Sequence, residues 1–170
     1  MHSGGGGSWT PAYIGLGSNL DDPIRQVLTA FDELAQLPDC RLVARSRLYR
    51  SDPVGVRDQP RFINAVAGLL TQRTAPALLE ELKALEARHG RDRKAERWGP
   101  RTLDLDLLAY DDARVEAPDL NLPHREIASR SFVLCPLAEI APDLLLPGQG
   151  TVGQLAAACD RRGLELLEDD

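Results

Sequence analysis

Two aspartates, Asp104 and Asp106, lie on either side of a single leucine in the stretch RWGPRTLDLDLLAYD. If this stretch is a strand, side chains two residues apart share one face and lie roughly 6–7 Å apart. Magnesium binds one or two carboxylates and completes its coordination shell with waters and substrate phosphates. The pair is therefore a candidate for holding two magnesium ions that bridge a triphosphate and neutralise charge on the transferred group.

The alternative interpretation of this pair is an edge strand whose solvent-facing side happens to carry two acidic residues. Leu103, Leu105 and Leu107 alternate with the aspartates, so the leucines enter the core on one face while both carboxylates leave it on the other. This partition favours the metal site, and so do the arginines that precede the strand.

The segment before this strand is strongly basic. Between residues 88 and 101 six basic residues oppose two acidic ones, a surplus of +4 on a chain of net charge −6, so the remainder carries −10. A local cationic patch on an acidic protein indicates a small anion, and the overall charge argues against binding nucleic acid by bulk electrostatics. Arg91, Arg93 and Arg101 have the forked guanidinium that suits phosphate oxygens, whereas the other basic residues can simply be solvated.

Three further residues each allow two interpretations. Trp98 either anchors its loop or covers a planar ring. Asn64 interrupts an apolar strand, so its amide needs partners in the backbone or in a ligand. His124 either donates to a phosphate or is a surface histidine without a role. No GxSxG motif exists and no cysteine adjoins a histidine, which fits a direct transfer without a covalent intermediate.

Hydrophobic periodicity predicts the elements that position these residues. Strands are expected over residues 9–18, 41–49 and 62–71 and from residue 104, and amphipathic helices over 23–37 and 75–89. Asp21 or Asp22 is expected to cap the first helix, which begins at Pro23. The order β-α-β-β-α-β predicts an α+β fold with a ferredoxin-like antiparallel sheet and helices packed on it. Helices near 132–140 and 152–161 would form a C-terminal helical extension, followed by a frayed acidic tail.

Length and composition are those of a soluble globular protein. The 170 residues, 43% hydrophobic, predict a single domain over residues 9–170, and residues 1–8 (MHSGGGGS) have the composition of a flexible tag or linker. Cys40, Cys135 and Cys159 are too few and too scattered for a disulfide framework and are expected to be small buried hydrophobes. Neither a signal peptide nor an apolar run of about 20 residues is visible, which predicts a cytoplasmic protein.

Four segments together resemble the 6-hydroxymethyl-7,8-dihydropterin pyrophosphokinase family of folate biosynthesis. RWGPRTLDLDLL resembles its signature segment, AYIGLGSNL its opening strand, DPVGVRDQPRFINAV its pterin-side loop and strand, and LPH followed by RSFVLCPLAEIAPDL its C-terminal segment. The order and spacing of all four agree. The resemblance implies a ferredoxin-like enzyme that moves the β,γ-pyrophosphoryl group of ATP to the hydroxymethyl oxygen of the pterin and releases AMP.

The resemblance also implies roles for individual residues. Asp104 and Asp106 would hold two Mg²⁺ ions that accompany ATP, and Arg91 and Arg93 would reach the phosphates from a mobile loop. The residues expected at the ATP site are Glu86, Arg93, Trp98, Arg101, Leu107 through its backbone, His124 and Arg130. The residues expected around the pterin are Ser51, Val54, Phe62, Asn64, Trp98 and Phe132. The ring would stack between the two phenylalanines while the Asn64 amide contacts its polar edge.

Two positions depart from the family pattern. The histidine is followed by Arg125 and Glu126, where the family commonly has proline (PHPR), so which arginine of this turn touches ATP stays open. Asp52 stands where a proline is frequent, which could alter the loop without touching the ring contacts. Neither departure removes a metal ligand.

Two rival functions remain compatible with the residues. One is a ferredoxin-like phosphotransferase that moves a single phosphoryl group and releases ADP; the other is a regulatory module that senses ATP without turning it over. An RNA-binding domain is weaker, because RNP-type aromatic strands and positive charge are lacking. The expected partners are ATP and hydroxymethyl-dihydropterin, with no nucleic acid and no membrane. We expect a monomer that could associate with other folate enzymes.

Overall fold

The computed structural model describes residues 8–53, 58–90 and 102–167. Its main sheet is antiparallel, with the strand order β10-β3-β4-β1-β5 and with β2 also paired to β4. The strands of this sheet are β1 (Thr10–Ser18), β2 (Cys40–Arg45), β3 (Tyr49–Ser51), β4 (Phe62–Thr71), β5 (Asp104–Tyr110) and β10 (Leu164–Leu166). These pairings confirm the predicted α+β class with an antiparallel sheet.

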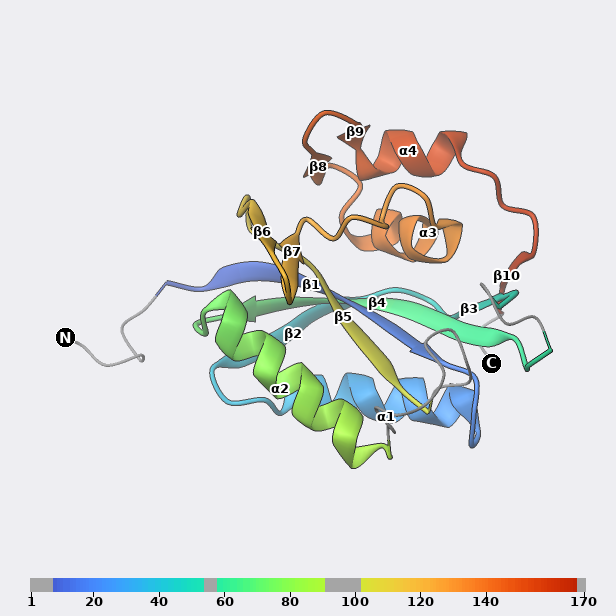
Figure 1. The fold of residues 1–170 in the computed structure, drawn as a ribbon, viewed down its shortest axis with the longest axis horizontal. Coiled ribbons are helices and arrows are strands. Elements are labelled where there is room, and N and C mark those ends of the chain that lie inside the picture. Colours follow the sequence, from blue (N-terminus) through green and yellow to red (C-terminus); the bar gives the residue numbers. More distant parts are fainter. Residues whose placement is uncertain (1–7, 54–57, 91–101, 168–170) are drawn as a thin grey trace.

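Helices cover both faces of the sheet (Figure 1). The helices α1 (Pro23–Ala35) and α2 (Ala75–Arg88) lie on one face, and α3 (Ser131–Ile140) and α4 (Val152–Ala158) lie over the other. Two small hairpins lie in the connections between these elements. β6 (Val115–Ala117) and β7 (Leu120–Leu122) lie between β5 and α3, and β8 (Leu145–Leu146) and β9 (Gly150–Thr151) lie between α3 and α4. The sheet therefore separates a lower layer of two helices from an upper, C-terminal layer.

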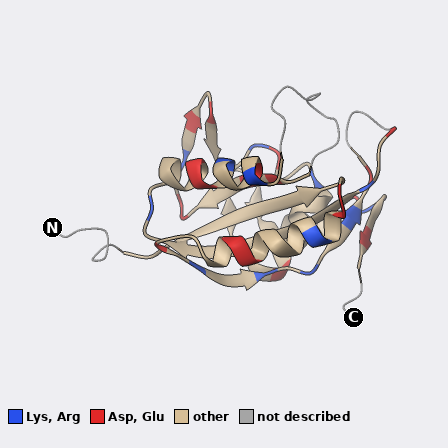
Figure 2. Ribbon diagram, turned by 90° about the horizontal axis from the view of Figure 1, so that it is seen from below, with Lys and Arg blue, Asp and Glu red and all other residues tan. Residues whose placement is uncertain are grey.

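Each layer has its own hydrophobic core. Alternation along β4 sends Ile63 and Ala65 into the core beneath the sheet, and it places Asn64 and Val66 on the α3 face. The lower core includes Val27, Ala30, Phe31 and Leu34 of α1 with Leu78, Leu82 and Leu85 of α2. Their 3.6-residue spacing confirms the predicted amphipathic helices. Seen from below, most charges lie on helix exteriors, turns and strand ends (Figure 2).

The predicted strand over residues 41–49 is wrong in detail, because the chain forms two strands there. Ser46 lies between β2 and β3, and its hydroxyl accepts a hydrogen bond from the Val66 backbone N–H at 2.9 Å. A side-chain oxygen thus occupies the place of a strand carbonyl. Both strands still pair with β4, so the interruption leaves the sheet order intact.

Three predictions about element ends and the tail are also wrong. Asp22 precedes α1 in a left-handed conformation (φ 63°), and its side chain makes no capping hydrogen bond, although its carbonyl accepts from Gln26 N at 3.0 Å. The last helix ends at Ala158 rather than near residue 161. The tail was expected to fray, yet Leu164–Leu166 adds β10 to the sheet edge, where β3 supplies backbone partners.

No helix within the described residues is both long enough and apolar enough to cross a membrane.

Candidate active site

The candidate site lies on the α3 face of the sheet, where three strands bring chemically different residues into one row. Gly17 of β1 is paired with Asn64 of β4 on one side and with Asp104 of β5 on the other. Directly paired residues of neighbouring strands present their side chains on the same face. The amide and the carboxylate therefore lie on one surface with a glycine between them.

The second aspartate belongs to the adjacent row of the same face. Asp106 is paired with Gly15, which in turn is paired with Val66. Asp106 is exposed and Asp104 half-buried, whereas Leu103, Leu105 and Leu107 are at most 4% exposed. The predicted separation of leucines and aspartates onto opposite faces of this strand is confirmed. Each aspartate is paired with a glycine of β1.

Gly17 gives the amide its space. A Cβ atom at this position would lie 3.3 Å from Asn64 Oδ1, a closer contact than most Cβ atoms make. Any larger residue would push the amide aside or narrow the gap between Asn64 and Asp104. Gly17, a strand residue of the AYIGLGSNL segment, thus has a steric role at the centre of the row.

Asn64 is held by a neighbouring hydroxyl. Its Nδ2 donates to Ser51 Oγ at 2.6 Å, and both residues are buried, at 6% and 5% exposure. The sequence suggested backbone or ligand partners for this amide and missed the serine side chain, which lies 13 positions earlier in the chain. This bond uses one amide N–H, so the amide retains a second donor and its carbonyl oxygen for a ligand.

His124 has a fixed orientation at the upper edge of β5. Its backbone N–H donates to Leu108 O at 2.7 Å, and the Glu126 backbone N–H donates to its Nδ1 at 3.1 Å. In the neutral imidazole the proton is then on Nε2, which becomes the donor available to a ligand. The same turn leads to Arg130, whose Nη2 lies 2.9 Å from Glu126 Oε2.

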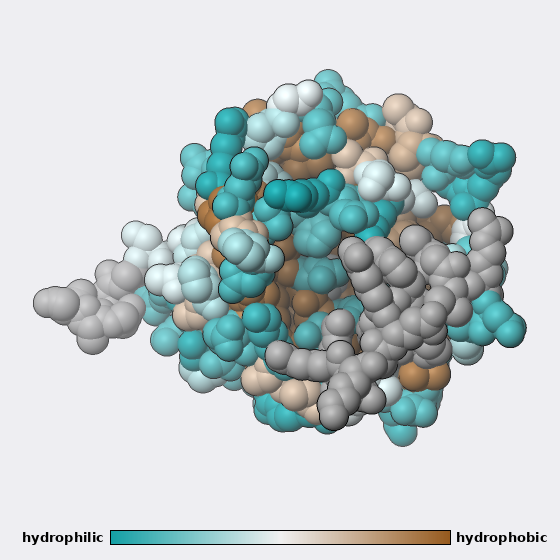
Figure 3. Space-filling model, in the orientation of Figure 1, coloured by the Kyte–Doolittle hydropathy of each residue, from teal (hydrophilic) through white to brown (hydrophobic). Residues whose placement is uncertain are grey.

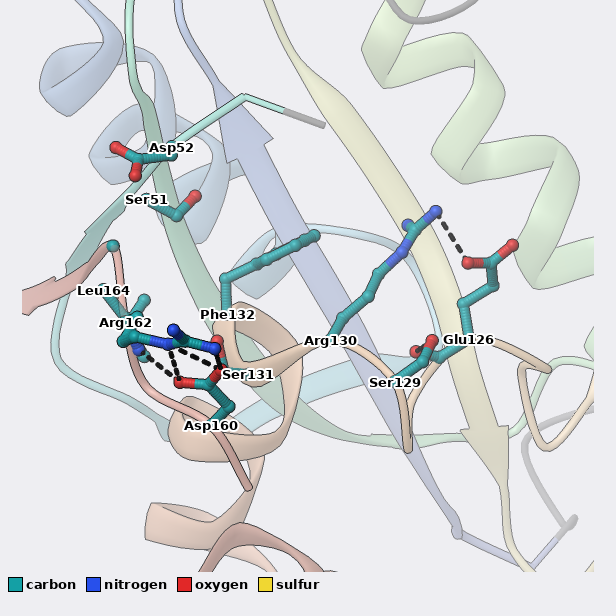
Figure 4. A pocket seen from close by; sticks show the side chains of 11 residues that line it. Ser51, Asp52, Glu126, Ser129, Arg130, Ser131, Phe132, Asp160, Arg162 and Leu164 are labelled. Carbon is teal, nitrogen blue, oxygen red and sulfur yellow. Dashed lines mark hydrogen bonds and ion pairs between the residues drawn. The ribbon is translucent and has the colours of Figure 1, made fainter. Parts of the chain in front are cut away.

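A pocket of about 400 Å³ opens beside this turn (Figure 4). Phe132, at the start of α3, projects between Ser51 and Arg130, and the Arg130 guanidinium lies 5.6 Å from the centre of its ring. The side of the molecule seen in Figure 3 has apolar residues between hydrophilic ones near its middle. The remaining lining residues are Asp52, Glu126, Ser129, Ser131, Asp160, Arg162, Gly163 and Leu164. The sequence did not suggest that the C-terminal segment contributes to this wall, because its pairing with β3 is tertiary.

Glu86 links α2 to the strand of the aspartates. Its Oε2 accepts a hydrogen bond from the Leu105 backbone N–H at 2.8 Å. This bond fixes β5 between the two aspartates and places a third carboxylate beside the strand. Leu107, the other residue expected near the nucleotide, is 3% exposed, so only its backbone could serve a ligand.

Five of the predicted site residues lie outside the described residues. They are Val54, Arg91, Arg93, Trp98 and Arg101. The described residues bring together Ser51, Phe62, Asn64, Asp104, Asp106, His124, Arg130 and Phe132 on or above one face of the sheet.

The two buried thiols, Cys40 and Cys135, are unsuited to nucleophilic catalysis. Burial raises the pKa of Cys135 to about 11, helped by neighbouring Cys159, and burial likewise raises the pKa of Cys40. A neutral thiol is a poor nucleophile. All three cysteines are free; Cys40 and Cys135 are buried as expected, but Cys159 is only half-buried.

Comparisons with known proteins give a consistent result. The family described as 7,8-dihydro-6-hydroxymethylpterin-pyrophosphokinase matches residues 13–142. A relative from Pseudomonas aeruginosa, named 2-amino-4-hydroxy-6-hydroxymethyldihydropteridine pyrophosphokinase, is 49% identical over 155 residues, covering 91% of this chain and 95% of its own. A relative of the same name from Methylorubrum extorquens is 47% identical over 159 residues, covering 94% and 99%.

The fold is also similar to a solved structure of lower sequence identity. The crystal structure of Plasmodium falciparum HPPK-DHPS wild type with pteroate matches with a TM-score of 0.71 at 13% identity. The match covers 88% of this chain and 42% of that longer one, so this chain spans less than half of it. At this identity the likeness supports the fold alone.

Proposed function

The chain belongs to the 7,8-dihydro-6-hydroxymethylpterin-pyrophosphokinase family and is a pyrophosphokinase of folate synthesis, and we propose that ATP is its pyrophosphoryl donor. In the proposed reaction the hydroxymethyl oxygen bonds to the β-phosphorus of ATP. The bond from that phosphorus to the α,β-bridging oxygen breaks, AMP leaves with the oxygen, and the hydroxyl proton passes to solvent. The observation that supports this most is the row of Asn64, Gly17 and Asp104 across three strands.

The pterin belongs at the Asn64 end of the row. A pterin is flat and has a polar edge of alternating donors and acceptors, which an amide with one free N–H and one free carbonyl can match. Phe62 precedes Asn64 by two residues on the same face of β4, and Phe132 reaches the pocket from α3. Two aromatic rings on either side of the amide would bind the heterocycle by stacking.

The phosphates belong at the Asp104 end. The described residues contain no group of three or more His, Cys, Asp or Glu side chains that could hold a metal by themselves. Two neighbouring carboxylates, one exposed and one half-buried, fit magnesium, because it takes few protein ligands and completes its shell with water and phosphate oxygens. When bound there, magnesium would neutralise charge that develops on the phosphoryl oxygens. Asp104 and Asp106 would fix its position relative to the amide.

His124 and Arg130 would bind the nucleotide. The Nε2–H of His124 is the free donor of a ring whose other nitrogen is already bonded. The guanidinium of Arg130 can exchange its Glu126 partner for a phosphate oxygen without leaving the pocket wall. Arg91, Arg93, Arg101 and Trp98 remain proposed contacts to the phosphates and the closed site, and Val54 to the pterin.

The proposed function extends to the fold class, the metal ions and the partners of the protein. The two halves β1-α1-β2 and β4-α2-β5, with β4 beside β1, support assignment of the sheet to the ferredoxin-like class. We also propose a cytoplasmic monomer that takes two Mg²⁺ ions with ATP. Association with other folate enzymes is suggested by the name HPPK-DHPS of the longer structural neighbour.

Product analysis with ATP, magnesium and 6-hydroxymethyl-7,8-dihydropterin tests the proposal. Stoichiometric AMP that requires both the pterin and magnesium is the expected result, and EDTA should abolish it. ADP would retain the nucleotide site but reject pyrophosphoryl transfer. ATP binding without any product would favour a sensor instead.

A further inference from the structure

The strand that carries Ser51 is short and is held on both edges. β3 has three residues; Ser51 is paired with Phe62 of β4 on one side and with Leu164 of β10 on the other. A three-residue strand with one free edge would depend on β4 alone. The C-terminal strand therefore completes the support of the residue that orients Asn64.

Backbone hydrogen bonds mark both ends of the β10 pairing. The Asp52 N–H donates to Gly163 O at 3.2 Å, and the Leu167 N–H donates to Leu48 O at 2.9 Å. A proline at position 52 would have no N–H and would lose the first of these bonds, whereas Asp52 makes it. Asp52, which stands where the family frequently has proline, thus supplies a backbone donor to the residue preceding β10.

Charged side chains add a second, weaker connection. Arg61 donates from Nη2 to Gly163 O at 3.1 Å and lies 3.1 Å from Asp52 Oδ1, while Arg50 lies 2.9 Å from Glu165 Oε1. These side chains are 36–66% exposed, and exposed ion pairs contribute about 0–1 kcal/mol each. The backbone pairing is therefore the main attachment of β10.

β10 also forms part of the wall of the pocket. Gly163 and Leu164 line it together with Ser51 and Phe132 (Figure 4). Pairing places Leu164 on the same face as Ser51, so β10 both bounds the pocket and sets the position of the serine hydroxyl. A shift of β3 would turn or release the Asn64 amide, whose hydrogen bond to Ser51 is only 2.6 Å long.

We propose that β10 is a positioning element for pterin recognition, acting through Ser51 on the Asn64 amide. The proposal rests on the proposed function, since it takes the pterin as the ligand of that amide. Loss of the β10 pairing should weaken binding of the pterin far more than binding of ATP, because β4 and β1 separate β3 from β5, the strand that carries the aspartates.

The pairing offers a matched pair of proline substitutions. The bonds at Gly163–Asp52 and Leu167–Leu48 imply, by alternation, that Glu165 is hydrogen-bonded to Arg50 and that the Leu166 N–H points away from β3. Glu165→Pro therefore removes a donor of the pairing, whereas Leu166→Pro puts the same ring at a position without one. Glu165→Ala removes the ion pairs and keeps the backbone donor.

Steady-state kinetics and thermal unfolding of the full chain test the inference. Glu165→Pro is expected to raise KM for the pterin about tenfold while KM for ATP stays within about twofold. Leu166→Pro and Glu165→Ala should change either constant by less than about twofold. Equal changes in both constants, or none in either, would overturn the inference while leaving AMP formation by the unmodified enzyme intact. Failure of that enzyme to form AMP would instead reject the proposed function.

A second pair of variants guards against misfolding of Glu165→Pro. Gly163 and Gly148 share φ +78°, but a Cβ at Gly163 would lie 2.4 Å from Asp52 Oδ2 and one at Gly148 would have no neighbour within 4 Å. Both alanine variants carry the same backbone strain. Only Gly163→Ala, whose methyl group would displace the Asp52 side chain beside the β3–β10 pairing, should raise KM for the pterin, by less than Glu165→Pro does. A similar rise in Gly148→Ala would contradict the inference.

Discussion

The two faces of one sheet differ sharply although they are built from the same strands. Beneath the sheet, β1, β4 and β5 contribute mostly apolar residues, which pack against α1 and α2; buried Ser18 and Thr71, at strand ends, are polar exceptions. On the α3 face the same strands contribute Gly15, Gly17, Asn64, Asp104 and Asp106. The lower face is packed against helices along its length, whereas the upper face combines its own apolar core with a row of glycines and polar residues where we propose that ligands bind.

If this division is correct, substitutions on the two faces should separate catalysis from stability. The largest effect is expected at the aspartates. Asp104→Ala and Asp106→Ala should each lower kcat about 100-fold or more, because metal-assisted charge neutralisation is worth several kcal/mol, with little change in the unfolding temperature. Asp112→Ala, in the exposed turn at the other end of β5, is the control. Near-normal turnover in either site variant would overturn the metal assignment.

The opposite result is expected beneath the sheet. Leu82 of α2 is fully buried in the lower core. Leu82→Ala should lower the free energy of unfolding by about 2–5 kcal/mol through lost burial and the cavity left behind. Denaturant titration would measure this loss, while both KM values of the folded enzyme should be unchanged. A selective change in one KM would show that the faces are not independent.

A smaller effect is expected at the centre of the row. Gly17→Ala would place a methyl group 3.3 Å from Asn64 Oδ1, so the amide must move. KM for the pterin should rise about fivefold, with KM for ATP less affected. Gly68→Ala, further along the same face of β4, adds a methyl 3.4 Å or more from its neighbours and serves as the control. If Gly17→Ala and Gly68→Ala changed KM for the pterin equally, the proposed steric role of Gly17 would be wrong.

An effect confined to alkaline pH is expected for the stability of the upper layer. Cys135 has a pKa of about 11 in the fold against an ordinary 9.0, so the folded protein keeps this proton to a higher pH than the unfolded chain does. The resulting stability is complete below about pH 9 and is lost as pH rises toward 11, by about 1–3 kcal/mol. In Cys135→Ala the free energy of unfolding, measured by urea titration, should fall less steeply between about pH 9 and pH 11. Because the pKa of Tyr49 is raised as well, some decline should remain, and an unchanged slope would contradict the prediction.

Local patterns predicted the parts of the fold that local forces decide. The bounds of β4 and the partition of Leu103, Asp104 and Leu105 follow from strand alternation, and α2 follows from its apolar spacing. Of the candidate site, only the resemblance to a known family implied that Asn64 and Asp104 belong to one site; their alignment through Gly17 was not expected, since residues 40 positions apart meet by strand pairing.

The features that the sequence did not predict have a different physical origin. Ser46 interrupts a strand through its side chain, and Ser51 orients Asn64 across two strands. β10 is three residues long and forms only because β3 has a free edge. None of these contacts leaves a periodic signal in the sequence, because each depends on a partner brought close by the completed sheet.

The pairing of Asn64 with Gly17 and of Gly17 with Asp104 has a consequence for substrate size. Neighbouring strands lie about 4.7–4.9 Å apart, so the backbones that carry the amide and the carboxylate are separated by about 9–10 Å. Backbone hydrogen bonds fix this separation, and side-chain repacking cannot adjust it. A heterocycle whose hydroxyl extends one bond further than a hydroxymethyl group would therefore bind the amide normally yet place its oxygen out of line with the phosphate. Such an analogue would inhibit without reacting.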